Sequence, residues 1–190
     1  MTTWGASGDE IATRLPGDEL VEDPPYSVTH GITIHGTPAD IWPWLLQLGQ
    51  ERGGFYSYQQ LENLVGCQIH NIYEIDPTIQ IKSVNERVSL GATEAHPSYI
   101  VRAIEPEHAL VLYGEDPAVK TTWQYVLKPI DAKRTRLLVR SHFAWKPGFV
   151  NWLFYAVVVP PLHFIMERKM MLTVKRLVES SVDSIAERQD

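Results

Sequence analysis

The sequence predicts an α+β domain in which a curved antiparallel β-sheet wraps around a long C-terminal helix. Three observations support this fold class: an early strand followed by two short helical segments, a run of short β-type segments, and a closing amphipathic helix. A helix with one apolar stripe must cover a sheet, and a meander of alternating strands offers it one apolar face. Where the helix and the sheet do not meet fully, an internal pocket remains.

The first 25 residues are predicted to be an N-terminal extension with a short helix. Ser7 and Glu10 have the spacing of a capping box, which predicts a helix over residues 8–14. A loop rich in proline and glycine follows. Residues 26–190 are then expected to form a single domain.

The domain is expected to open with one strand and two helices. Residues 26–35 alternate in polarity as a half-buried strand does. Thr37 suits the N-cap of a helix over residues 38–48, which Pro43 is expected to kink. A second helix is predicted over residues 55–65.

The middle of the chain is predicted to be an antiparallel meander, because short β-type segments follow one another with short connections rich in Pro, Gly, Asp and Glu. The predicted strands are residues 79–83, 87–90, 98–104, 109–113, 121–129 and 135–146. From Pro160 onward, apolar residues recur at helical spacing and predict the long closing helix.

Composition excludes several classes of function. The net charge of -6 argues against a nucleic-acid partner, since phosphate binding relies on a basic face. Cys67 is the only cysteine, so neither a disulfide framework nor a thiolate zinc site is expected. We expect no metal and no cofactor. The N-terminus lacks a basic patch followed by an apolar run, so a cytoplasmic location is expected.

Residues 149–165 are strongly apolar and could be mistaken for a membrane span. The segment contains Asn151, His163 and a Pro-Pro pair, and it is shorter than the ~20 apolar residues that a bilayer requires. We therefore expect an apolar hairpin or lid, with no stable membrane insertion. Docking of residues 150–161 on a membrane or a partner remains an alternative.

The chain resembles the START/Bet v 1-like superfamily with the helix-grip fold, which includes proteins labelled polyketide cyclase/dehydrase or SRPBCC. The resemblance covers nearly everything after Pro25, and residues 53–58 with 61–63 are similar to a subgroup of unassigned function. The other matching segments are residues 37–45, 109–112, 122–127 and 135–139, together with the closing helix. This fold hosts both carriers and enzymes, so the resemblance implies a pocket rather than one chemistry.

The resemblance implies that the apolar faces of the strands turn toward the closing helix and that the helical insert lies near the pocket mouth. Aromatic walls with a few polar groups suit an apolar or ring-containing ligand, although plain core packing is the alternative for any single residue. The candidate ligand-binding residues are Trp44, Tyr56, Tyr58, Glu62, His70, Tyr99, Val101, Trp123, Tyr125, Ser141, Phe143, His163, Met166 and Met170.

Three residues are candidates for acid–base catalysis: His163, Glu167 and Tyr56. A carboxylate one helical turn from an imidazole can orient the ring and raise its pKa, which would suit proton transfer. The alternative is a structural hydrogen bond between helix and sheet. No second pair of ligands at matching spacing follows, so a metal site is not predicted.

The sequence therefore favours binding or carriage of a small hydrophobic molecule, such as a lipid, a polyketide or an isoprenoid-like compound. The second hypothesis is a cofactor-independent cyclase, dehydratase or isomerase that uses the same cavity. A homodimer is compatible with the sequence but is not predicted by any motif.

Overall fold

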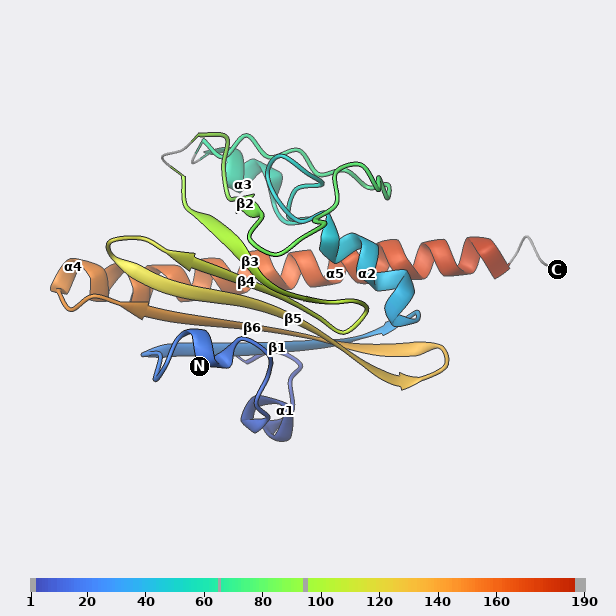
Figure 1. Ribbon diagram of the computed structural model, residues 1–190, viewed down its shortest axis with the longest axis horizontal. Coiled ribbons are helices and arrows are strands. Elements are labelled where there is room, and N and C mark those ends of the chain that lie inside the picture. Colours follow the sequence, from blue (N-terminus) through green and yellow to red (C-terminus); the bar gives the residue numbers. More distant parts are fainter. Residues whose placement is uncertain (1–2, 65, 94–95, 187–190) are drawn as a thin grey trace.

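The computed structural model describes residues 3–64, 66–93 and 96–186. In this part of the chain, six strands form one antiparallel sheet in the order β1-β6-β5-β4-β3-β2, which curves around the long helix α5 (Figure 1). The predicted α+β fold class is confirmed. The elements are α1 (Gly8–Ala12), η1 (Asp18–Leu20), β1 (Tyr26–His35), α2 (Pro38–Leu46), α3 (Gln59–Leu64), β2 (Arg87–Ser89), β3 (Ser98–Glu105), β4 (Ala109–Glu115), β5 (Val119–Asp131), β6 (Arg134–Trp145), α4 (Phe149–Trp152), the π-helix η2 (Leu153–Val158) and α5 (Val159–Ala186).

Helix α2 begins where the local sequence predicts. Thr37 accepts a hydrogen bond from the Asp40 backbone N–H, and the Asp40 carboxylate accepts one from the Thr37 N–H at 2.8 Å. Pro38 occupies the first turn, where its missing N–H costs nothing. Helix α2 packs against α5.

Two predicted elements differ from the structure. The helix expected over residues 55–65 begins only at Gln59, because Tyr56 adopts a φ of 55°, which a right-handed helix does not permit. The strand expected over residues 79–83 is a loop. Its buried Ile81 donates its backbone N–H to the carbonyl of Leu46 at the end of α2 rather than to a sheet.

The closing helix begins earlier than predicted. Residues 149–165, expected to be an apolar hairpin or lid, form a continuous helical stretch made of α4, η2 and the start of α5. Pro160 and Pro161 lack backbone N–H groups, and the wider turns of η2 lie directly before them. The prolines therefore fall near the start of α5, and the chain continues through them as a helix.

The main core lies between the sheet and the two helices α2 and α5. Buried residues of α5, including Met171, Val174 and Val178, pack with strand residues such as Leu112 and Leu137. Because these residues are almost fully enclosed, this half of α5 is held firmly against the sheet.

The other face of the sheet is covered by the N-terminal residues, and α1 lies on the side away from α5 (Figure 1). Arg140 of β6 is 4% exposed and connects this segment to the sheet. Its guanidinium donates hydrogen bonds of 2.7 to 2.9 Å to the hydroxyl of Thr29, the carboxylate of Asp18 and the carbonyls of Glu10, Ile11 and Thr13. The buried charge is thus fully solvated by the protein itself.

We expect Arg140→Met to lower the free energy of unfolding by about 3 kcal/mol, because it leaves a partly buried carboxylate and several carbonyls without their donor. Urea denaturation measures the change. The matched control is Arg134→Met: this half-exposed arginine pairs with Asp131 at the surface, and its loss should cost less than about 1 kcal/mol. Equal losses in the two variants would contradict this account.

Candidate functional site

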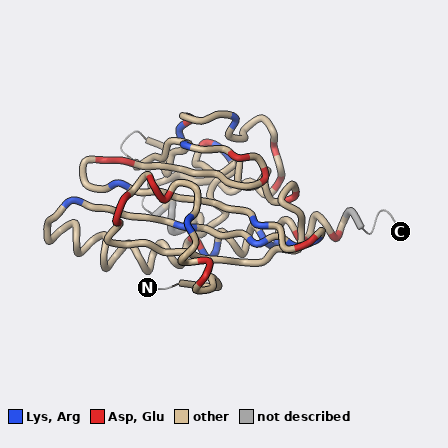
Figure 2. The backbone as a smooth tube through the Cα atoms, turned by 60° about the horizontal axis from the view of Figure 1, so that its bottom comes forward, with Lys and Arg blue, Asp and Glu red and all other residues tan. Residues whose placement is uncertain are grey.

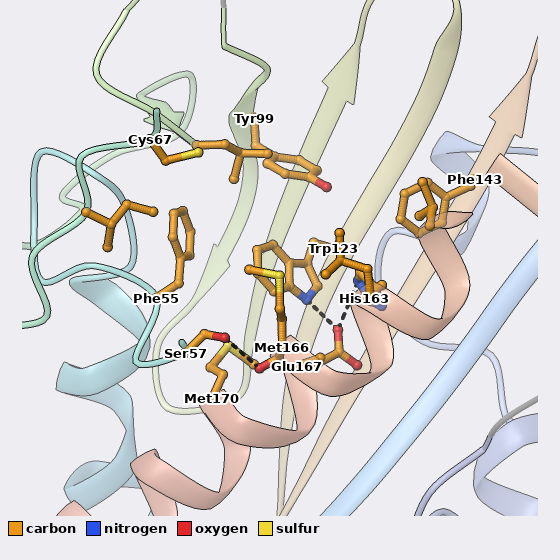
Figure 3. A pocket seen from close by; sticks show the side chains of 14 residues that line it. Phe55, Ser57, Cys67, Tyr99, Trp123, Phe143, His163, Met166, Glu167 and Met170 are labelled. Atoms are coloured by element: carbon orange, nitrogen blue, oxygen red, sulfur yellow. Dashed lines mark hydrogen bonds and ion pairs between the residues drawn. The ribbon is translucent and has the colours of Figure 1, made fainter. Parts of the chain in front are cut away.

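A cavity of about 440 Å³ lies between the sheet and the first half of α5 (Figure 3). Its volume is in the range of small-molecule sites. Its walls are mostly aromatic and aliphatic, with few polar atoms exposed to the space. The lining residues are Phe55, Ser57, Cys67, Ile69, Leu90, Tyr99, Trp123, Phe143, Val159, Leu162, His163, Met166, Glu167 and Met170.

Aromatic rings form the wall on the side of the sheet. Trp123 of β5, Tyr99 of β3 and Phe143 of β6 line the cavity. Each lies on the face of its strand that turns toward α5, because successive side chains of a strand point to opposite faces. The Trp123 ring centroid is 5.8 Å from that of Tyr99 and 5.8 Å from that of Phe55, with which it is stacked. These rings make a continuous aromatic surface.

Helix α5 supplies the opposite wall. Val159, Leu162, Met166 and Met170 follow one another at spacings of three or four residues, so they lie along one stripe of the helix. The two methionines are flexible and polarizable, which lets this wall adapt to the shape of a ligand.

The loop before α3 closes one side of the cavity. Tyr56 is fully buried in the core, whereas its neighbours Phe55 and Ser57 line the cavity. Asn71 accepts the Tyr56 backbone N–H at 2.8 Å and so supports the left-handed turn. The Ser57 hydroxyl donates to the carbonyl of Met166 at 3.1 Å, which attaches the loop to α5.

A buried carboxylate connects α5 with three strands beside the cavity. Glu167 is 2% exposed. Its Oε2 accepts hydrogen bonds from Trp123 Nε1 at 2.8 Å and from the Ser141 hydroxyl at 3.4 Å, and its Oε1 is paired with Nδ1 of His30. The Nε2 atom of His163 lies 3.3 Å from Oε2 (Figure 3).

The contacts in this cluster offset the free-energy cost of burying the Glu167 carboxylate. A carboxylate taken out of water is costly by several kcal/mol unless hydrogen bonds and opposite charge replace its hydration. The contacts to Trp123, Ser141 and His30 supply that replacement from β5, β6 and β1. Both oxygens of Glu167 are therefore engaged by the protein.

His163 and Tyr99, which both line the cavity, are uncharged near pH 7. Burial lowers the pKa of His163 below its ordinary 6.5, and the nearby Glu167 carboxylate only partly opposes this. Burial also raises the pKa of Tyr99 to about 12. A neutral imidazole and a neutral phenol among apolar walls suit an uncharged or weakly polar ligand.

No family model matches the sequence, and no curated protein matches it. Solved structures do match. A hypothetical protein from Helicobacter pylori has a TM-score of 0.54 at 13% identity, over 86% of this chain and 94% of that one. Truncated norcoclaurine synthase from Thalictrum flavum has a TM-score of 0.50 at 15% identity, over 80% of this chain and 92% of that one. The chain has a START/Bet v 1-like helix-grip fold.

The helix-grip fold brings many of the candidate residues to one place. They come from β3, β5, β6 and α5, elements far apart in the sequence, and their side chains surround the same space. The candidate residues that line the cavity are Tyr99, Trp123, Phe143, His163, Met166, Glu167 and Met170.

Other candidate residues lie behind the cavity wall of the helix-grip domain. Trp44, Val101 and Tyr125 belong to the hydrophobic core. Ser141 is buried and contacts His163 and Glu167 without lining the cavity itself. These side chains shape the wall rather than contact the space.

The helical insert contributes less than the sequence predicts. Tyr56 is a core residue and does not line the cavity, so it is not placed there as an acid or base. Its burial also raises its pKa. Tyr58 is 43% exposed and His70 is also exposed. The side chain of Glu62 lies outside the described residues.

Sequence reasoning missed several lining residues and one member of the buried cluster. His30 interrupts the apolar face of β1, and that interruption was a usable signal of a buried polar contact. Val159 and Leu162 continue the helical stripe of Met166 and could have been found from it. No local signal marked the loop residues Phe55, Ser57, Cys67, Ile69 and Leu90.

Within the described parts of the chain, no group of three or more His, Cys, Asp or Glu side chains could hold a metal ion. The walls also lack the charged groups that would bind a phosphate-bearing cofactor. The expectation that neither is required stays a prediction.

We expect the protein to lose stability as the pH falls below about 6.5. Burial lowers the pKa values of His163 and His142 below 6.5, so in this window the unfolded chain binds more protons than the folded one. The free energy of unfolding should fall by about 1 kcal/mol per pH unit for each group until its folded pKa is reached. Urea denaturation at pH 7.5 and 5.5 measures this slope.

In the His163→Gln variant, the slope should be smaller than in the wild type, because one of the two groups no longer titrates. Absolute stability can differ between the proteins without affecting the comparison. An unchanged slope would refute the contribution of His163.

Proposed function

We propose that the protein binds a small hydrophobic molecule of the lipid, polyketide or isoprenoid-like kind. The observation that carries this proposal is the cavity of about 440 Å³ with aromatic and aliphatic walls. Protein interiors are normally packed as densely as organic crystals, and an unfilled hollow costs stability in proportion to its volume. A ligand that fills the space would recover those contacts.

The walls favour a ligand with a ring or branched apolar body. The spacing of the rings of Phe55, Trp123 and Tyr99 suits offset or tilted packing against a further ring. Met166 and Met170 on the opposite side would adjust to its outline. A charged ligand is disfavoured. The carboxylate of Glu167 lies at the wall but is already engaged by its protein partners, so no counter-charge is left for the ligand.

The second candidate is a cofactor-independent cyclase, dehydratase or isomerase. The neutral imidazole of His163 at the cavity wall favours it, since such a group can act as a base. Against it, Glu167 is engaged by Trp123 and His30, and Tyr56 lies away from the cavity. Norcoclaurine synthase, an enzyme by its name, shares the fold, but fold alone does not assign a reaction. Binding is therefore favoured.

Filling the cavity should weaken binding. We expect Met166→Trp to raise the Kd of N-phenyl-1-naphthylamine, a neutral fluorescent ring compound, by about tenfold or more, because the indole occupies the hollow. Fluorescence titration measures it. The matched control is Ile165→Trp, which adds the same side chain at a 48% exposed position on the other side of α5 and should bind like the wild type. Failure of the wild type to bind this probe, and absence of any co-purified hydrophobe by native mass spectrometry, would refute the proposal.

His163→Ala separates binding from catalysis. If the cavity serves binding, this variant should keep the Kd of N-phenyl-1-naphthylamine within about threefold of the wild type, since the walls of Trp123 and Met166 remain. Native mass spectrometry should still detect any co-purified hydrophobe with its mass unchanged. A hydrophobe that is converted by the wild type and accumulates unconverted on the variant would favour the enzyme instead.

A further inference from the structure

Residues 149–165 form an apolar segment that the cavity does not explain. It comprises α4, η2 and the first seven residues of α5, and it contains no Asp, Glu, Lys or Arg. In Figure 2, the helical coils at the end of the molecule opposite the C-terminus carry no charged colours. Its large apolar side chains exposed between 43% and 76% are Phe149, Val150, Trp152, Leu153, Phe154, Val157, Val158, Leu162 and Ile165.

The exposure extends around the helix rather than along one face. Residues two apart point in directions about 200° apart on a helix, yet Val150, Trp152 and Phe154 are 76%, 50% and 49% exposed. Helices α4 and η2 contact chiefly each other and α5. The segment therefore presents apolar surface to its surroundings on nearly all sides, far more than the scattered apolar residues of an ordinary surface.

The composition of the segment and of its ends indicates what covers it. A protein partner typically covers one face and needs polar groups at the rim, whereas a helix that is apolar all round suits hydrocarbon. Lys146 precedes the segment, and Arg168 and Lys169 follow it, so cations flank both ends. Long basic side chains at such positions extend to lipid phosphates. Trp152 and a tyrosine within the segment are residue types enriched at the bilayer interface.

The segment is not suited to span a bilayer. Among the described residues, one helical stretch, Phe149–Ser184, is long and apolar enough by length and composition. Its uncharged part, residues 149–166, is however only about 27 Å long, less than the ~30 Å of a hydrocarbon core. The next turns of α5 place Glu167 in the buried cluster and Met171 and Val174 in the core, so they cannot leave the sheet without unfolding.

We propose that residues 149–165 dock this protein on the surface of a lipid bilayer, with the apolar side chains inserted shallowly and Lys146, Arg168 and Lys169 at the phosphate level. The docking requires no ligand in the cavity. Because Val159 and Leu162 also line the cavity, docking places one cavity wall beside the acyl chains. An apolar ligand could then pass between bilayer and cavity with little exposure to water.

Vesicle flotation tests the docking directly. The full chain is mixed with vesicles of phosphatidylcholine, with or without phosphatidylserine, and centrifuged. We expect the wild type to float with the vesicles, and the double variant Phe149→Asp with Val150→Asp to lose at least about tenfold in partition coefficient. The matched control, Val84→Asp with Ile130→Asp, changes two side chains of about 49% and 48% exposure elsewhere and should float like the wild type.

Both double variants change exposed residues, and urea denaturation with N-phenyl-1-naphthylamine titration would verify that fold and cavity are intact. A wild type that floats with neither kind of vesicle overturns the proposal, and so does equal flotation of the two double variants. If the wild type instead self-associates in sedimentation velocity, and only the Phe149 and Val150 changes abolish this, a second copy of the chain covers the segment. A wild type that floats with the vesicles but does not bind N-phenyl-1-naphthylamine would refute the cavity proposal alone.

Discussion

The buried carboxylate of Glu167 is the constraint on which the rest of the structure depends. One side chain of α5 contacts β1, β5 and β6 through His30, Trp123 and Ser141. Because an ionised group without these partners would be costly in the interior, these contacts favour the observed register and rotation of the helix on the sheet. That register directs one stripe of α5 into the cavity and leaves the opposite side of its first turns exposed.

The same constraint supports the proposal that the cavity binds a ligand rather than catalysing a reaction. The acid–base candidates His163 and Glu167 both line the cavity, but the Glu167 carboxylate already accepts a hydrogen bond from Trp123 and so joins the helix to the sheet. The rest of the cavity surface is mostly aromatic, aliphatic and thioether, with Trp123 and Met166 on opposite walls. Such a surface gives affinity through shape and dispersion rather than through directed polar contacts.

The two faces of the sheet are stabilised by different interactions, apolar packing on one face and the polar contacts of a buried arginine on the other. On the cavity side, apolar side chains of α2 and α5 pack against the strands and leave part of the space empty. On the other side, Arg140 reaches across the sheet surface and binds the N-terminal segment through carbonyls and Asp18. Among the described residues, the start of the closing helix, residues 149–165, carries a dense run of exposed large apolar side chains. Its exposure is consistent with a role outside the folded body, at a bilayer.

Features set by near neighbours in the chain could be predicted from the sequence alone. They include the Thr37 cap of α2 and the helical stripe through Met166, since each follows from backbone periodicity or a local hydrogen bond. The inward direction of Trp123 on β5 is implied by the resemblance to the helix-grip fold. Only the tertiary structure decided that Glu167 pairs with His30, 137 residues away, and that Tyr56 turns into the core while its neighbours face the cavity. The physical reason is that packing and the cost of burying polar groups select partners that are distant in the sequence. They also select the conformation of the loops between elements. No local sequence pattern encodes either choice.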